Sequence, residues 1–405
     1  MIVLYGLGTT IGAGIYALVG EVASIAGYFA PISFLIASIT AGFTAISFAE
    51  LCGRYPRAAG ASLYVKQSFG SERFSTFVGL LVVLAGLVSA AALVNGFVGY
   101  LNQFIIIERI MAIVLITILL GGIAIWGIAE SVTIASLITI IEIGGIVLII
   151  AVSSEGLSSL SSKWTEMIPS ADITSWSGIY FGSILAFYAF IGFEDMVDVA
   201  EEVKNVKRNL PLAILLTLGI TTLLYMLLMI TALSSLTPTE LANSETPLAL
   251  IYEFHTGEKA FVISIIGMFA IINGALIQMI MASRVLYGLS SRGQLPTVLS
   301  NIYQHTQTPL IATIVVTIIC LVLALIGRLG SLAEATSLIM LTIFSLVNLA
   351  LWKIKRLDPE VEGVKIFPLW IPITGFFVSI GFVLIEIMGL ISGLFLLNTM
   401  CFGLC

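Results

Sequence analysis

The sequence predicts an all-α integral membrane protein of about 11–12 transmembrane helices. Of its 405 residues, 59% are hydrophobic and 10% are charged, and the mean hydropathy is +1.13. A soluble domain carries about 25% charged residues because its surface faces water. Apolar stretches of about 20 residues, which is the length that crosses a bilayer, follow one another with short polar segments between them. Two of these stretches contain glycine interruptions, which indicate discontinuous helices.

Apolar windows place eleven spans along the chain, and a short apolar tail follows them. The spans cover approximately residues 2–20, 28–50, 74–104, 110–128, 132–152, 178–199, 210–234, 260–284, 309–327, 331–352 and 368–388. Residues 389–405 are apolar but short for another span, so the sequence leaves eleven and twelve spans open.

The distribution of lysine and arginine predicts the orientation of the spans. The loops after spans two, six, eight and ten hold thirteen of the 17 basic residues, and the opposite side holds Arg109, Lys163, Lys259 and Arg328. Cytoplasmic loops of membrane proteins carry the excess of Lys and Arg. We therefore expect a multi-pass protein of the cell (plasma) membrane with its N-terminus in the cytoplasm.

The two glycine interruptions occupy corresponding places in the two halves of the chain. Gly12-Ala13-Gly14 lies in span one, and Gly192 lies in span six between Ile191 and Phe193. Each is in the first helix of a set of five, which predicts a five-plus-five inverted repeat. We expect the first repeat at residues 1–152, the second at 178–352 and C-terminal span(s) at 367–405. A glycine pair on its own also serves close packing of helices.

Broken helices one and six would create a ligand site. The half-helix N-terminus at a break carries a partial positive charge and free N–H donors, which suit a carboxylate. Carbonyls released at the other break accept hydrogen bonds from an ammonium group. A site with both ends matches a zwitterion, such as the backbone of an amino acid.

Four segments, in order along the chain, carry the motifs of a known transporter family. They are residues 6–16 (GLGTTIGAGIY), 49–70, 187–211 (from FYAFIGFE to the Leu-Pro at its end) and 283–296. Together they resemble the amino acid–polyamine–organocation (APC) superfamily of transporters and permeases. The chain departs from the family pattern at Ala59-Gly60 and at Asn205-Val206, in the loops after spans two and six.

The resemblance implies a LeuT-like inverted repeat and secondary active transport of amino acids by alternating access. Carried over by position, the backbone that would bind the substrate carboxylate is at Ile11, Gly12, Ala13 and Gly14. Carbonyls near Phe187, Ala189 and Phe190 would bind its ammonium, Tyr188 would close over it, and Ile191 would contact its side chain. Relatives of this kind are often monomeric, and no cofactor, metal or nucleic acid is implied.

Two carboxylates inside the spans are candidates for proton coupling or for shaping the site. Glu142 lies in the middle of span five, where a charge costs about 2.5–3.5 kcal/mol on insertion scales. The resemblance implies that relatives which couple transport to protons have a lysine at the position of Glu142. Glu142 either couples transport to protons or hydrogen-bonds the backbone near Gly12. Glu194, directly after the second break, is expected to hold the free N–H groups there.

Several alternatives remain open on the sequence alone. A channel would need repeated filters or charged rings, and an enzyme would need a nucleophile–base set or metal ligands; neither pattern is present, so we do not expect an enzyme. Proton symport, amino acid exchange and a non-transporting amino acid sensor stay possible. The expected substrate site, which we call the seat, has no charged side chain, and this favours a neutral substrate. Asn95, Asn273 and Gln278 are polar residues within spans, and we expect them to bond neighbouring helices. Asp195 and Asp198 are closer to the cytoplasmic half, where we expect them to line the inner vestibule.

Overall fold

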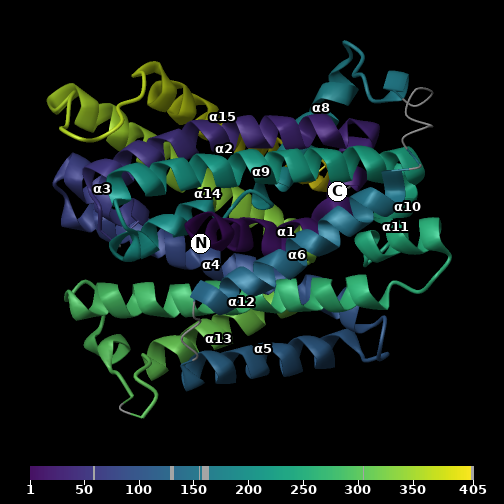
Figure 1. The fold of residues 1–405 in the computed structure, drawn as a ribbon, viewed down its shortest axis with the longest axis horizontal. Coiled ribbons are helices and arrows are strands. Elements are labelled where there is room, and N and C mark those ends of the chain that lie inside the picture. Colours follow the sequence, from purple (N-terminus) through teal and green to yellow (C-terminus); the bar gives the residue numbers. More distant parts are fainter. Residues whose placement is uncertain (58–59, 128–131, 155, 157–163, 304, 403–405) are drawn as a thin grey trace.

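The computed structural model describes residues 1–57, 60–127, 132–154, 156, 164–303 and 305–402, and these form long helices aligned with the longest axis of the molecule (Figure 1). Beside the helices, the described residues form only one isolated β-bridge, between Tyr303 and Thr308. The elements at the expected spans are α1 (Ile2–Ala26), α2 (Ala30–Arg54), α4 (Glu72–Leu101), α5 (Arg109–Trp126), α6 (Val132–Val152), α8 (Ile173–Tyr188) with the 3-10 helix η4 (Phe193–Glu202), α9 (Val206–Ser235), α12 (Phe261–Ser291), α13 (Leu310–Ile326), α14 (Leu329–Leu357) and α15 (Trp370–Phe402).

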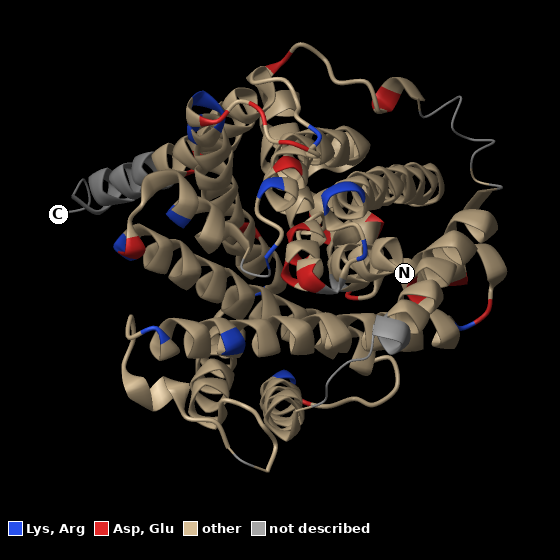
Figure 2. Cartoon of the chain, turned by 60° about the vertical axis from the view of Figure 1, so that its left-hand side comes forward, with Lys and Arg blue, Asp and Glu red and all other residues tan. Residues whose placement is uncertain are grey.

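The connecting segments add short helices, of which α3 (Gly60–Phe69), α10 (Pro238–Ala242) and α11 (Pro247–Thr256) are the longest. Within the described residues, eight helical stretches are long and apolar enough to cross a membrane, and three shorter apolar helices accompany them. Charged residues gather mainly at helix ends and in connecting segments (Figure 2). The tail from residue 389 to 402 continues α15 instead of forming a separate twelfth helix.

The helix packing repeats when the first five spans are exchanged for the second five. Helix α2 packs on α9, α4 on α12, and α5 on α13, so corresponding members of the two sets are neighbours. The contact of α1 with α9 has its counterpart in α8 with α2, and that of α1 with α6 in α8 with α14. This pattern is the five-plus-five inverted repeat that the paired glycine segments predict.

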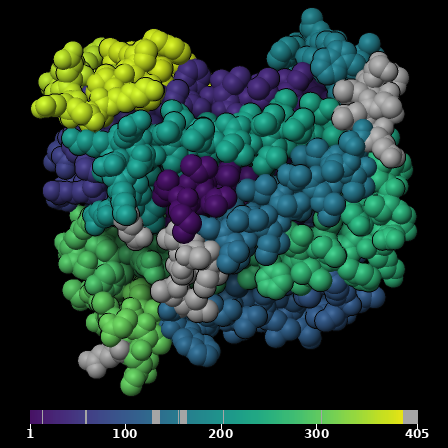
Figure 3. Space-filling model, viewed as in Figure 1, coloured from purple at the N-terminus to yellow at the C-terminus, as the bar shows by residue number. Residues whose placement is uncertain are grey.

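Helix α1 is the central element of the fold. It packs on α6, α8, α9 and α12, and its N-terminal residues reach the surface between α9 and α6 (Figure 3). Ile11, Ile15 and Tyr16 are completely buried. The residues of α1 are apolar on nearly every face of the helix. An all-round apolar helix is typical of the interior of a large membrane bundle.

The break expected at Gly12–Gly14 in span one is not present, because α1 is helical from Ile2 to Ala26. Gly14 instead allows close helix packing. A Cβ atom on Gly14 would lie 2.9 Å from the Cα atom of Ala189, so α1 and the end of α8 touch backbone to backbone. This is the packing role that small residues have in membrane helices. The break in span six is confirmed, since α8 ends at Tyr188 and η4 begins at Phe193.

Candidate functional site

The interruption between α8 and η4 is built around Gly192. Its φ angle is +124°, a conformation that L side chains rarely adopt. A Cβ atom there would also lie 2.2 Å from the carbonyl oxygen of Thr9 on α1. The chain can therefore break at this point only with glycine, and the broken backbone lies directly against α1.

Side chains from three elements satisfy the backbone groups that the break releases. The Thr9 hydroxyl donates to the Gly192 carbonyl at 3.0 Å, and the Gly192 N–H donates to the Glu194 carboxylate at 2.9 Å. The hydroxyl of Tyr225, on α9, lies 3.0 Å from the carbonyl oxygens of both Thr10 and Ala189. Unwound backbone within a membrane needs such partners, because lipid supplies none.

A cavity of about 460 Å³, including its open space, lies beside the break, and we call it the central cavity. Its walls come from α1, α4, α8 and α12, together with the residues of the break. The lining residues are Gly8, Thr9, Thr10, Gly14, Ser89, Leu93, Tyr188, Ile191, Asp195, Gly274, Ile277 and Gln278.

A second cavity, of about 720 Å³ including its open space, adjoins the first, and we call it the vestibule. It is lined by α2, α3, α4, η4, α12 and α14. Ser89, Ile191, Asp195 and Gln278 line both cavities and so mark the junction between them. The central cavity is therefore continued toward α3, at the end of the molecule where α2 meets its following loop.

On the α8 side of the break, Tyr188 closes against α4. Its hydroxyl lies 2.9 Å from the Ser89 hydroxyl and 3.3 Å from the Ser89 carbonyl oxygen, and its ring is 5% exposed. The resemblance implies an aromatic lid at this position. The contact that holds it comes from α4, a helix on which we predicted no site residue.

The residues expected to bind substrate fall into two groups. Gly14, Tyr188 and Ile191 line the central cavity. The other expected residues lie in the packed region around that cavity: Ile11, Gly12, Phe187, Ala189 and Phe190 are buried, and the Ala13 side chain is outside the described part of the structure. The expectation that the seat has no charged side chain is wrong, because Asp195 lines the central cavity.

Glu142 is 1% exposed and lies on α6 beside α1. A Cβ atom on Gly12 would be 3.6 and 3.7 Å from its two carboxylate oxygens, so the carboxylate faces the backbone of α1 near Gly12. The hydroxyl of Tyr16 donates to the Glu142 carbonyl at 2.7 Å and joins the same two helices. This placement agrees with both roles considered for Glu142, proton coupling and support of α1.

The structure adds cavity residues that sequence reasoning missed, namely Ser89 and Leu93 on α4 and Gly274 and Ile277 on α12. The signal that could have found Gln278 was its polarity in an apolar span, which we interpreted as helix–helix bonding. Asn95 does bond other helices, since it donates to the Ala324 carbonyl at 3.0 Å and accepts from Arg109 at 2.7 Å. Among the described residues, no group of three His, Cys, Asp or Glu side chains could hold a metal ion.

Comparison with known proteins identifies relatives along nearly the whole chain. The family model described as amino acid permease matches residues 2–402. The chain is 30% identical to the vacuolar cationic amino acid transporter 4 of Arabidopsis thaliana, over 89% of this chain and 63% of that protein. It is 25% identical to the branched-chain amino acid permease BcaP of Bacillus subtilis, over 90% of this chain and 83% of the permease. The chain spans about six tenths of the length of the plant relatives it matches.

Other similarities concern a further relative and the fold. The chain is 24% identical to the methylthioribose transporter of Bacillus subtilis, over 89% of this chain and 81% of that protein. The solved structure of MhsT in complex with L-phenylalanine superimposes with a TM-score of 0.64 at 14% sequence identity. That superposition covers 96% of this chain and 97% of MhsT, so the two share a LeuT-type fold.

Proposed function

Because the chain belongs to the amino acid permease family, we propose that it is a secondary carrier that moves amino acids across a membrane by alternating access. The observation that carries the proposal is the central cavity at the α8–η4 break. Tyr188 closes it on one side, while the vestibule continues it on the other. A cavity with access from one side only is the arrangement that a carrier needs in each of its two end states.

The seat of the amino acid backbone is proposed to lie where α1 meets the break. Tyr225 has one hydroxyl proton for the Thr10 and Ala189 carbonyls, so at least one of these oxygens keeps capacity for a substrate ammonium. The carboxylate is proposed to take N–H groups of Ile11, Gly12, Ala13 and Gly14. In this conformation α1 is helical there, so these groups become available only when that turn opens.

We infer that residues 1–152 and 178–352 act as two repeats that move against each other, with the segment from residue 367 outside them. The repeated helix packing supports this division. The excess of basic residues near α3 and η4 supports a cytoplasmic vestibule and N-terminus, so that the present conformation faces inward. We propose the plasma membrane as its location, as for a bacterial permease, although plant relatives carry vacuolar and mitochondrial names.

Energy coupling is proposed to be proton symport through Glu142, with exchange of amino acids as the alternative. The support for Glu142 is its burial beside α1, within reach of the turn that must open. Glu194 has the site-shaping role in this proposal, because its carboxylate accepts from the Gly192 N–H. A monomer is proposed as the working unit, since both repeats are within one chain.

The test is uptake of a panel of radiolabelled amino acids into proteoliposomes that contain the purified chain, with and without an inward proton gradient. Accumulation above equilibrium under the gradient is expected for symport. Uptake that requires preloaded amino acid would identify an exchanger. Binding without any flux would contradict the carrier proposal and favour a sensor, and neither binding nor flux would contradict the amino acid assignment.

A further inference from the structure

Asp195 lies at the junction of the central cavity and the vestibule. It is one of four residues that line both, together with Ser89, Ile191 and Gln278. It is also the only residue with a charged side chain among the described residues that line the central cavity. A ligand that extends from the seat toward the vestibule must therefore pass this carboxylate.

The two carboxylates near Asp195 have surroundings that differ from those of Asp195. Glu194 accepts the Gly192 N–H at 2.9 Å and belongs to the structure of the break. Asp198 lies against the start of α3, where a Cβ atom on Gly60 would be 3.3 Å from its Oδ1 atom. A helix N-terminus favours such a negative charge. The Asp195 carboxylate forms no hydrogen bond or ion pair with any residue that the structure describes.

No positive charge on the protein faces this carboxylate inside the cavities. The described residues that line the central cavity and the vestibule include no Lys, Arg or His. The vestibule wall beside the junction is largely apolar, with Met281, Met340 and Phe344 among its residues. A carboxylate in such surroundings loses hydration, and a bound cation offsets that loss when it forms a direct pair.

We propose that Asp195 binds the side-chain cation of a basic amino acid and so selects lysine- or arginine-like substrates. The proposal rests on the proposed function, since the amino acid backbone would occupy the seat between α1 and the break. From there the side chain extends toward the junction. The apolar walls contact its aliphatic stem, and the ammonium or guanidinium group pairs with the Asp195 carboxylate. A neutral side chain of equal length leaves that carboxylate without a partner, which is the basis of discrimination.

The experiment compares matched pairs of amino acids as inhibitors of amino acid uptake in proteoliposomes that contain the full chain. L-lysine is compared with L-norleucine, and L-arginine with L-citrulline, because each pair differs mainly in side-chain charge. The wild-type protein is expected to prefer the cation in each pair by about tenfold or more, as for a hydrogen bond to a charged group. In Asp195→Asn the preference should fall to about threefold or less, while inhibition by norleucine and citrulline persists.

Two further variants separate the role of the charge from general effects. Asp195→Glu keeps the carboxylate and should keep most of the preference, which distinguishes lost charge from a lost fold. Glu72→Gln removes one negative charge from an exposed pair with Lys66, outside both cavities, and should leave the preference unchanged.

The outcomes of this experiment are distinguishable. A wild-type protein that transports neutral amino acids and ignores the basic ones overturns the inference about Asp195 and leaves the proposed function intact. An unchanged preference in Asp195→Asn also overturns the inference. A wild-type protein that neither binds nor moves any member of the panel removes the proposed function itself.

Discussion

At the scale of single residues, Gly192 has two properties that only glycine combines. Its backbone has a positive φ angle, and it lies against the Thr9 carbonyl with no room for a methyl group. Gly192→Ala must therefore move α1 away from the break or change the backbone conformation between α8 and η4. We expect at least about a tenfold loss of amino acid uptake and a lower melting temperature, because strained backbone alone costs about 1–3 kcal/mol.

The matched control is Gly219→Ala, at a glycine of α9 around which a Cβ atom would meet nothing within 4 Å. Alanine is more favourable than glycine in a helix. This variant should therefore have unchanged amino acid uptake and an equal or higher melting temperature. Equal behaviour of the two variants would contradict the role assigned to Gly192.

Glu142 provides a second prediction at this scale, which concerns energy coupling. Glu142→Gln keeps the size and polarity of the side chain but cannot release a proton. If Glu142 couples transport to protons, the variant should still exchange amino acids across the membrane but should no longer accumulate them under an inward proton gradient. Uptake that keeps its response to the gradient would leave Glu142 with the structural role beside Gly12 only. Paired measurements of exchange and accumulation in the same proteoliposomes distinguish these results.

The same residues show why the site could be predicted only in part. The motif around Gly192 identifies the break because few residue types permit one. Gln278 carries no such signal, since a polar residue in a span can face a neighbouring helix or a cavity. Which of these it faces depends on how α4, α12 and η4 pack, and no short sequence pattern encodes that packing. Asp195 was expected at the vestibule only, so the substrate site expected from α1 and α8 lacked its charge.

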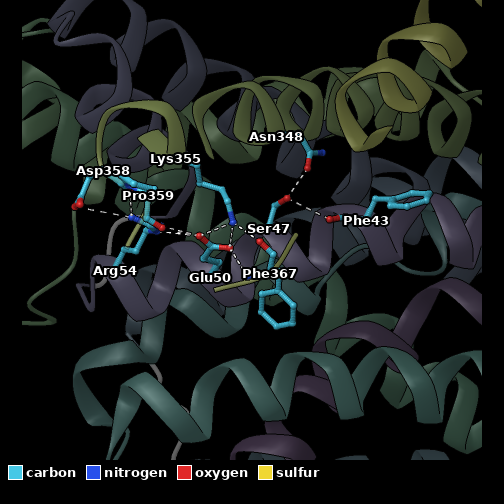
Figure 4. Close-up of polar contacts among 9 residues, drawn as sticks. All are labelled: Phe43, Ser47, Glu50, Arg54, Asn348, Lys355, Asp358, Pro359 and Phe367. Atoms are coloured by element: carbon cyan, nitrogen blue, oxygen red, sulfur yellow. Dashed lines mark hydrogen bonds and ion pairs between the residues drawn. The ribbon is translucent and has the colours of Figure 1, made fainter. Parts of the chain in front are cut away.

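At the scale of elements, a buried ionic network joins α2, α14 and the loop before α15 (Figure 4). The Glu50 carboxylate is 2.8 Å from the Lys355 ammonium and 2.9 Å from the Arg54 guanidinium, and it accepts the Phe367 N–H at 3.0 Å. The three charged side chains are 0–5% exposed. Nearby, Asn348 of α14 accepts from Ser47 of α2 at 2.6 Å, so the two helices are joined at two levels.

This network predicts an order of stability among variants. Glu50→Gln leaves the buried Lys355 without a counter-charge and leaves Arg54 with only a 4.0 Å pair to the exposed Asp358 carboxylate, whereas Lys355→Met leaves Glu50 paired with Arg54. Removal of one partner of a buried pair costs about 3–5 kcal/mol, and we expect the larger effect for Glu50→Gln. The fraction of monodisperse protein in detergent, measured over a temperature ramp, gives the order. Greater stability of Glu50→Gln than of Lys355→Met would contradict this account.

The helices themselves were the most predictable elements, because eleven apolar stretches leave little choice in a membrane. All eleven expected spans coincide with helical elements. The short helices α3, α10 and α11 were not predicted, since they lie outside the apolar windows. The continuity of α1 was also missed, because Gly12 and Gly14 serve close packing and helix breaking equally well.

At the scale of the whole molecule, the orientation in the membrane determines which solution the vestibule faces. Lys204 and Lys259 are exposed, at the end of η4 and before α12 respectively. In a background without the native cysteines, we expect Lys259→Cys to react with a membrane-impermeant maleimide on intact cells. Lys204→Cys should react only after permeabilisation, because basic loops stay in the cytoplasm. The reverse labelling pattern would place the vestibule on the outer side.

The unbroken helix α1 has a consequence for the measured affinity. If the substrate carboxylate takes N–H groups of residues 11–14, only molecules in which that turn has opened are competent to bind, and the apparent affinity falls with the competent fraction. Gly12 sets this fraction, because glycine weakens a helix by about 1 kcal/mol relative to alanine. A methyl group on Gly12 would make only ordinary contacts, none closer than 3.6 Å. Gly12→Ala should therefore weaken substrate binding about fivefold, as seen in equilibrium titrations, by making the closed population larger while the cavity itself stays the same.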